Sequence, residues 1–126
     1  MMQDNKKVVF ISGPITGVGC YWEAFEEAEM MLESLGYIAL TPSRLPQGMT
    51  IAQYTRICLA MIDSADAAVF LPGYEDSEGS RLEHSHCLYT GKPLIRLRTE
   101  DFLCGGVYPA EVTRSWLKHD LGEVLN

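Results

Sequence analysis

Apolar positions in this chain come in short β-branched runs separated by longer stretches with helical spacing. Residues 8–11 form a buried-type apolar run that stops at Ser12-Gly13-Pro14, which predicts a first strand covered on both faces. In residues 21–35 the apolar positions recur at near-helical spacing, with glutamates filling most of the other side. A first helix is expected there, followed by a second strand at residues 37–41.

The same alternation continues along the rest of the chain. Thr50-x-x-Gln53 has the spacing of a capping box and predicts the start of a second helix. Residues 67–71 and 94–97 are expected to be strands, and residues 79–89 and 109–121 to be helices. In the last helix, Val112, Trp116 and Leu117 are expected to pack onto the sheet.

This order of elements predicts an α/β fold. Strands that alternate with helices are typical of a doubly wound, Rossmann- or flavodoxin-like parallel sheet, here of four to five strands with helices on both faces. Residues 1–126 are expected to form one domain. Ligands bind beyond the carboxyl ends of such strands, where two polar loops are expected, at residues 12–17 and 72–80.

Composition narrows the class of partner. With 47% hydrophobic and 21% charged residues, a packed globular domain is expected. The net charge of -7 disfavours binding to a nucleic acid polymer, although a mononucleotide needs only a local anion site. No apolar run approaches the ~18 residues of a membrane span, and the first residues lack an apolar signal core. A cytoplasmic protein without membrane association is expected.

The four cysteines are widely spaced, at positions 20, 58, 87 and 104, and form no C-x-x-C pair. Reduced, partly buried thiols are therefore expected, and zinc is disfavoured. Glu83-x-x-His86 has the carboxylate-histidine spacing of di-metal sites, but it occurs once and without partner glutamates. No metal is expected, and His84 or His86 could instead donate a proton to a departing base.

The first loop is Ser12-Gly13-Pro14-Ile15-Thr16-Gly17. Its glycines allow the backbone to approach a ligand closely, and Thr16 can donate a hydrogen bond. The loop lacks the G-K-[ST] ending of a P-loop and is not G-x-G-x-x-G. On its own the loop is weak evidence for a ligand site, because a tight turn between a strand and a helix explains the same residues.

The second loop contains Ser77-Glu78-Gly79-Ser80, with Glu83 about one turn into the following helix. Hydroxyls and free N–H groups at a helix start can hold a phosphate, and the helix dipole there favours an ionised carboxylate. Such a carboxylate suits a nucleophile that attacks a sugar. Ser80-x-x-Glu83 is also the spacing of a capping box, in which Glu83 would only reach back to the helix start.

Several segments together resemble a known family. ISGPITG at residues 11–17, Ala65-Asp66 before an apolar strand, and LPGYEDSEGSRLEHSHC at residues 71–87 resemble the nucleoside 2-deoxyribosyltransferase-like proteins. The small uncharacterised branch found in phages and bacteria is the most similar, and 2'-deoxynucleoside 5'-monophosphate N-glycosidases are relatives. The resemblance extends to about Leu97. Asp66 is also read as a residue that fixes the entry to its strand.

The resemblance implies roles for individual residues. Glu83 matches the glutamate that attacks the anomeric carbon, and Ser77 matches a phosphate-binding serine of the monophosphate glycosidases. The phosphate and sugar contacts implied are Ser12, Gly13, Ile15, Thr16, Gly17, Ser77, Gly79 and Ser80. Apart from the resemblance, Tyr74 on the second loop could stack on the base, and Asp76 could touch the sugar or face solvent. Arg81 follows this loop and could pair with the phosphate or lie on a solvent-exposed helix face.

One position departs from the family pattern. The related enzymes carry an aspartate about two helical turns before the residue that matches Asp66, and this chain has Cys58 there. Asp63, Asp76 or Tyr54 could replace that aspartate. Because an acidic residue is missing at this position, the protein could also be a nucleotide-binding module without catalysis.

The sequence therefore predicts cleavage or transfer at the N-glycosidic bond of a small (deoxy)nucleotide, with a 5'-monophosphate favoured and Glu83 as nucleophile. No cofactor is required, because the carboxylate itself can stabilise the sugar cation. The alternatives are a nucleotide-binding or sensing module and an NAD-type glycohydrolase. By resemblance alone, a homo-oligomer is expected, with a dimer favoured.

Overall fold

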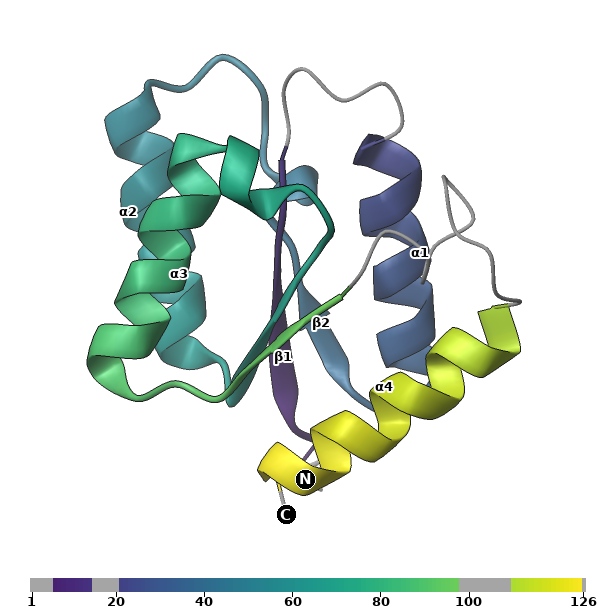
Figure 1. The fold of residues 1–126 in the computed structure, drawn as a ribbon. Coiled ribbons are helices and arrows are strands. Elements are labelled where there is room, and N and C mark those ends of the chain that lie inside the picture. Colours follow the sequence, from purple (N-terminus) through teal and green to yellow (C-terminus); the bar gives the residue numbers. More distant parts are fainter. Residues whose placement is uncertain (1–5, 15–20, 98–109, 126) are drawn as a thin grey trace, which may run out of the picture.

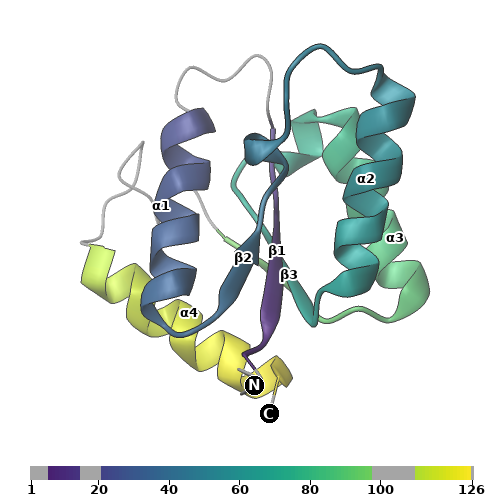
Figure 2. The ribbon, with the colours of Figure 1, turned by 180° about the vertical axis from the view of Figure 1, so that it is seen from behind.

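The computed structural model describes residues 6–14, 21–97 and 110–125. Within them lies a four-stranded sheet in the order β2-β1-β3-β4, and every pair of neighbouring strands is parallel. Helices α1 and α4 cover one face of the sheet, and helices α2 and α3 cover the other (Figures 1 and 2). The predicted doubly wound α/β fold is confirmed.

The predicted strands and helices are all present, with small differences at their ends. The strands are β1 (Val8–Ser12), β2 (Ile38–Leu40), β3 (Ala67–Phe70) and β4 (Leu94–Arg96), and the helices are α1 (Tyr21–Ser34), α2 (Ile51–Ser64), α3 (Glu78–Thr90) and α4 (Ala110–Leu125). Two short 3-10 turns, η1 (Pro42–Arg44) and η2 (Tyr74–Asp76), were not expected from the sequence.

Local hydrogen bonds explain where two of these elements begin. Thr50 and Gln53 form the predicted capping box, with Gln53 N donating to Thr50 Oγ1 at 3.1 Å and Thr50 N donating to Gln53 Oε1 at 2.9 Å. Val8 N donates to Asp66 Oδ2 at 2.8 Å. Asp66 therefore connects the start of β3 to the start of β1, and the prediction that it fixes the entry to its strand is confirmed.

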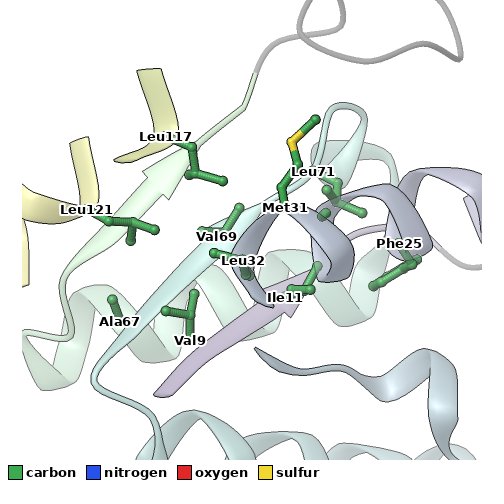
Figure 3. Packing of buried hydrophobic residues seen from close by; sticks show 11 residues of the cluster. Val9, Ile11, Phe25, Met31, Leu32, Ala67, Val69, Leu71, Leu117 and Leu121 are labelled. Carbon is green, nitrogen blue, oxygen red and sulfur yellow. The ribbon is translucent and has the colours of Figure 1, made fainter. Parts of the chain in front are cut away.

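The face covered by α1 and α4 is entirely apolar at its centre. Val9 and Ile11 of β1 and Val69 of β3 point toward Leu32 of α1 and the leucines of α4 (Figure 3). This group, the apolar cluster, comprises Val9, Ile11, Phe25, Ala28, Met31, Leu32, Ala67, Val69, Leu71, Leu117 and Leu121. Every second residue of β1 and β3 belongs to this cluster, as expected for strands, in which successive side chains point to opposite faces.

One expectation about α4 is wrong. Leu117 and Leu121 are buried and lie one helical turn apart, whereas Trp116 is 39% exposed. Trp116 precedes Leu117 by one residue, so its side chain is rotated by about 100° away from the buried stripe. The side chain of Val112 lies outside the part that the structure describes.

The face covered by α2 and α3 has a mixed composition. Its buried residues, the mixed cluster, are Phe10, Cys58, Ile62, Ala65, Ala68, Phe70, Tyr74 and Cys87. Phe10 and Phe70 alternate with residues of the apolar cluster along β1 and β3. Ser12 continues the Phe10 side of β1 by one more alternation, so it faces α2 and α3 at the carboxyl end of the sheet.

Candidate functional site

The turns that follow β1 and β3 touch each other. Leu71 N donates to Ser12 O at 2.8 Å. A Cβ on Gly13 would lie 2.9 Å from Leu71 Cβ, closer than real Cβ atoms approach other atoms, so a larger residue would force Leu71 or its backbone to move. Residues 12–14, named the first turn here, therefore touch residues 71–77, named the second turn. They are the described start of the predicted loop 12–17 and the larger part of the predicted loop 72–80. Ile15, Thr16 and Gly17 lie outside the described residues.

The Glu83 side chain points into this junction rather than back along its own helix. Ser12 Oγ donates to Glu83 Oε1 at 2.5 Å, although the two residues are 71 positions apart in the chain. Glu83 is 9% exposed and Ser12 is fully buried. The structure thus brings together the carboxylate predicted for the third helix and the first polar residue after the first strand.

The capping-box alternative for Glu83 is wrong. The N-cap of α3 is Ser77, whose Oγ accepts a hydrogen bond from Ser80 N at 3.3 Å, and the helix begins at Glu78. Glu83 consequently lies beyond the first turn of α3, too far along to reach the free N–H groups. The Glu83 carboxyl accepts its hydrogen bond from Ser12 of strand β1 and not from the main chain of its own helix.

This position also changes the electrostatics of Glu83. Burial raises the pKa of its carboxyl above the usual value, and hydrogen bonds from Ser12 and Cys58 act in the opposite direction. Because the helix dipole falls off within the first turn, it does not hold the carboxylate ionised, contrary to the expectation from sequence. Two donors from β1 and α2 stabilise the charged form instead.

Cys58 lies where the resemblance implies an aspartate, and it faces Glu83. Burial, followed by the charge of Glu83, raises the pKa of the Cys58 thiol to about 12, and burial raises that of Cys87 to about 11. Both thiols are free and buried. A thiol with so high a pKa keeps its proton at neutral pH and can donate it in a hydrogen bond.

Of the three residues proposed to replace the missing aspartate, two bond to other groups and one is exposed. Tyr54 Oη donates to Pro46 O at 2.5 Å, and Asp63 Oδ1 lies 2.8 Å from Nε2 of His86. Asp76 is exposed. Cys58 is therefore the group from α2 whose hydrogen bond influences the carboxyl of Glu83.

The second turn is held by its own side chains. Tyr74 is buried, and Arg81 Nη1 donates to Glu75 O at 2.7 Å. Ser80 is buried, with its backbone N–H bonded to Ser77 Oγ. Gly79 is exposed, and a Cβ there would meet no atom closer than 3.9 Å. A role of these residues in holding a phosphate, base or sugar stays a prediction.

Two comparisons with known proteins relate this site to a family and a fold. A family model described as a domain of unknown function, DUF4406, matches residues 7–96. This chain belongs to the DUF4406 family. No curated protein matches the chain. The matched residues include all four strands and the helices α1 to α3, so the DUF4406 segment contains both turns and Glu83.

A solved structure is similar to the DUF4406 chain in fold. It is the 2-deoxyribosyltransferase from Bacillus psychrosaccharolyticus, described as a biocatalyst for the synthesis of nucleosides. The superposition has a TM-score of 0.61 at 17% sequence identity, and it covers 83% of this chain and 79% of that chain. The DUF4406 protein is therefore deoxyribosyltransferase-like in its fold.

The described part of the DUF4406 chain shows no group of three or more His, Cys, Asp or Glu side chains arranged to hold a metal ion. The Glu83-x-x-His86 pair does not act together, because Glu83 bonds to Ser12 and His86 to Asp63. Within the same ranges, none of the helices is both long enough and apolar enough to cross a membrane.

Sequence reasoning missed Arg96 as a residue near this site. Arg96 ends β4 and lies opposite Phe70 of β3 in the sheet register. It interrupts an otherwise apolar run, Leu94-Ile95-Arg96-Leu97. A lone arginine at the carboxyl end of an expected strand was the signal that could have marked it.

Proposed function

We propose that the protein cleaves or transfers at the N-glycosidic bond of a small nucleotide, with a 5'-monophosphate favoured, and that Glu83 is the nucleophile. The observation that carries this proposal is a buried carboxyl at the junction of two turns, bonded to Ser12 of a distant strand. The fold shared with a 2-deoxyribosyltransferase supports it.

In the proposed first step, a Glu83 carboxylate oxygen bonds to the anomeric carbon of the sugar. The bond from that carbon to the base breaks, its electron pair leaves with the base, and the base takes up a proton from solvent. In the second step, water or another base attacks the same carbon, loses a proton to solvent and frees the carboxylate. Ser12 would orient the carboxylate and stabilise its charge whenever it is not bonded to sugar.

The protonation state sets the working pH of this mechanism. Only the carboxylate can attack, and burial raises the pKa of Glu83 above its usual value. Activity should therefore fall on acidification at a pH above the value expected for an exposed glutamate. Cys58 would oppose this shift by donating a hydrogen bond to the carboxylate while its thiol keeps the proton.

A phosphorylated substrate is favoured by the start of α3. Ser77 and Ser80 lie there with the backbone N–H groups of a helix N-terminus, which attract a phosphate. The resemblance of Ser77 to a phosphate-binding serine points in the same direction. A nucleoside without phosphate should be a poorer substrate.

The test is base release from a panel of deoxynucleosides, their 5'-monophosphates and NAD, followed by chromatography. We expect release from a monophosphate and a loss of more than about a thousandfold in Glu83→Gln, the scale seen when a nucleophile is removed. Glu33→Gln is the matched control, because Glu33 is an exposed glutamate on α1, outside the two turns. Release that survives in Glu83→Gln would overturn the role of Glu83.

A binding module without catalysis is the second candidate. Cys58 in place of an aspartate favours it. Such a module would be stabilised against heat by a nucleotide while no base is released. Release of nicotinamide from NAD alone would instead indicate the NAD-type glycohydrolase.

A homodimer is part of this proposal through the resemblance. Leu88 and Tyr89 of α3 are strongly exposed for apolar side chains. Light scattering coupled to size-exclusion chromatography should give twice the monomer mass of 14.1 kDa. A monomer at all concentrations would contradict this expectation.

A further inference from the structure

Three side chains from different elements form a hydrogen-bonded group beside the second turn. Arg96 Nε, at the end of β4, donates to Tyr74 Oη at 3.0 Å. Arg96 also approaches Nε2 of His84 with Nε at 3.2 Å and with Nη2 at 2.9 Å. One guanidinium therefore contacts both η2 and α3.

These contacts determine the chemical state of His84. A guanidinium only donates hydrogen bonds and never loses its proton in proteins. His84 Nε2 must therefore accept, so the imidazole is neutral and its proton lies on Nδ1. The protonated ring, in which both nitrogens are donors, cannot make this contact.

Aromatic contacts hold the same ring in place. The rings of His84 and Tyr74 are stacked, with centroids 5.2 Å apart and an interplanar angle of 27°. Phe70 of β3 meets the His84 ring edge-on, at 5.2 Å and 79°. Burial and the charge of Arg96 lower the pKa of His84, and Glu75 acts in the opposite direction.

The group lies directly beside the candidate site in the chain and in space. His84 follows Glu83 on α3, and Tyr74 begins the 3-10 turn that leads to Ser77. Tyr74 and His84 are themselves in contact, so Arg96 closes a link between β4, the second turn and the helix that bears the carboxylate.

We propose that Arg96 is a positioning residue for this site: by bonding to Tyr74 Oη and to His84 Nε2, it fixes the second turn against α3 and keeps His84 as the neutral Nδ1-H tautomer. Arg96 acts through these two residues and not on a substrate. The part of the proposal that concerns turnover rests on the proposed function; the tautomer and the link do not.

Acid should release this link. Protonation of His84 removes the acceptor at Nε2 and places a second cation beside Arg96. The other groups that face the ring are Tyr74 and Glu75 from the second turn and the uncharged Phe70 from β3. Because the pKa of His84 is lower in the folded protein than in the unfolded chain, the stability it contributes is complete above about pH 6.5 and declines as the pH falls through its folded value.

Nuclear magnetic resonance of the histidine ring nitrogens tests the link without any assay of activity. At pH 7.5 we expect a protonated Nδ1 and an unprotonated Nε2 for His84, assigned by the signals that vanish in His84→Gln. Arg96→Met should lose this tautomer preference and raise the pKa of His84. Arg81→Met is the matched control, because Arg81 donates to Glu75 O of the second turn, whereas the hydrogen bonds at His84 Nε2 come from Arg96.

The same variants test the positioning role. Arg96→Met should lower kcat/KM by about tenfold to a hundredfold, as expected for a small displacement of reacting groups, while Tm falls by only a few degrees. Arg96→Lys, which keeps the charge but loses the planar fork, should lie between Arg96→Met and wild type. His84→Gln offers an acceptor near the position of Nε2 but cannot be protonated there, so it should lose the acid-dependent release of the link.

The hydrogen-bonded link of Arg96 and its positioning role in turnover are refuted by different results. A wild-type His84 protonated on Nε2, or a tautomer unaffected by Arg96→Met, would refute the link itself. An unchanged kcat/KM in Arg96→Met, with base release intact in wild type, would refute the positioning role. If wild type releases no base, the proposed function fails while the tautomer measurement still decides the link.

Discussion

The two faces of the sheet are built from the same two strands but have different contents. On the side of α1 and α4, β1 and β3 contribute Val9, Ile11, Ala67 and Val69 to a cluster without buried polar side chains at its centre. On the side of α2 and α3, the mixed cluster contains two thiols and a tyrosine, and Ser12 and Glu83 lie at its edge.

The difference shows that one face stabilises the fold while the other also positions chemical groups. Burial of apolar side chains favours folding in proportion to area. Burial of Glu83 raises its pKa and opposes ionisation, so its donors from β1 and α2 must offset part of that cost. The α2–α3 face therefore gives up some stability to hold a carboxylate away from water.

Truncation of a central side chain on each face should produce the largest effects. Leu32→Ala in the apolar cluster and Ile62→Ala in the mixed cluster remove fully buried side chains, and each should cost about 2–5 kcal/mol of unfolding free energy. Denaturant titration measures both. A much smaller cost for Ile62→Ala would show that the mixed cluster is less tightly packed, whereas Met30→Ala, at an exposed position on α1, should change the unfolding free energy little.

A methyl group at the contact between the two turns should have the next largest effect. Gly13→Ala places a Cβ 2.9 Å from Leu71 Cβ and Cδ1, and the overpacking should cost about 1–3 kcal/mol. The control is Gly79→Ala, which meets no close atom and should be neutral or slightly stabilising as a helical residue. Equal unfolding energies for the two variants would contradict the close contact of the turns.

Neutralising the buried carboxyl should stabilise the protein in a pH-dependent manner. The pKa of Glu83 is raised in the folded protein. Between the usual glutamate pKa and this raised value, the folded protein binds more protons than the unfolded chain, so the stability of wild type falls as the pH rises. Glu83→Gln has no titrating group at this position, and its amide oxygen can still accept the hydrogen bond from Ser12. Its Tm advantage over wild type should widen with rising pH; a constant difference would argue against a raised pKa.

The smallest expected effect is on the reactivity of the two buried thiols, which should be alkylated slowly in the folded protein. At pH 8 a thiol with a pKa of about 12 or 11 is almost wholly protonated. Cys58 and Cys87 should therefore react with iodoacetamide at least about a hundredfold more slowly in the folded protein than in urea. Peptide mass spectrometry resolves the individual sites. Rapid labelling of Cys58 at pH 8 in the folded state would show that α2 does not shield it.

Hydrophobic spacing and local caps predicted most of the fold. The apolar run of β1, the capping box at Thr50 and the role of Asp66 depend on short-range patterns or on a strand entry, and the structure has them as predicted. The exposure of Trp116 was missed because neighbouring residues on a helix differ by only one step in angle, which spacing alone resolves poorly.

The site was less predictable because its decisive contacts are distant in sequence. Ser77 and Ser80 were both plausible caps, and spacing could not show that the helix begins at Glu78 and frees Glu83. The direction of the Glu83 side chain depends on Ser12, 71 positions earlier. Likewise, Arg96 acquires its partners only when β4 lies beside β3.

Helix α4 has a practical consequence for work on related chains. The family model stops at residue 96, yet Leu117 and Leu121 complete the packing over Val9, Ala67 and Val69. A fragment cut at the limit of sequence similarity would leave that hydrophobic surface bare and prone to aggregate. For expression or engineering, the folding unit extends at least to α4, although the sequence similarity to the family ends before it.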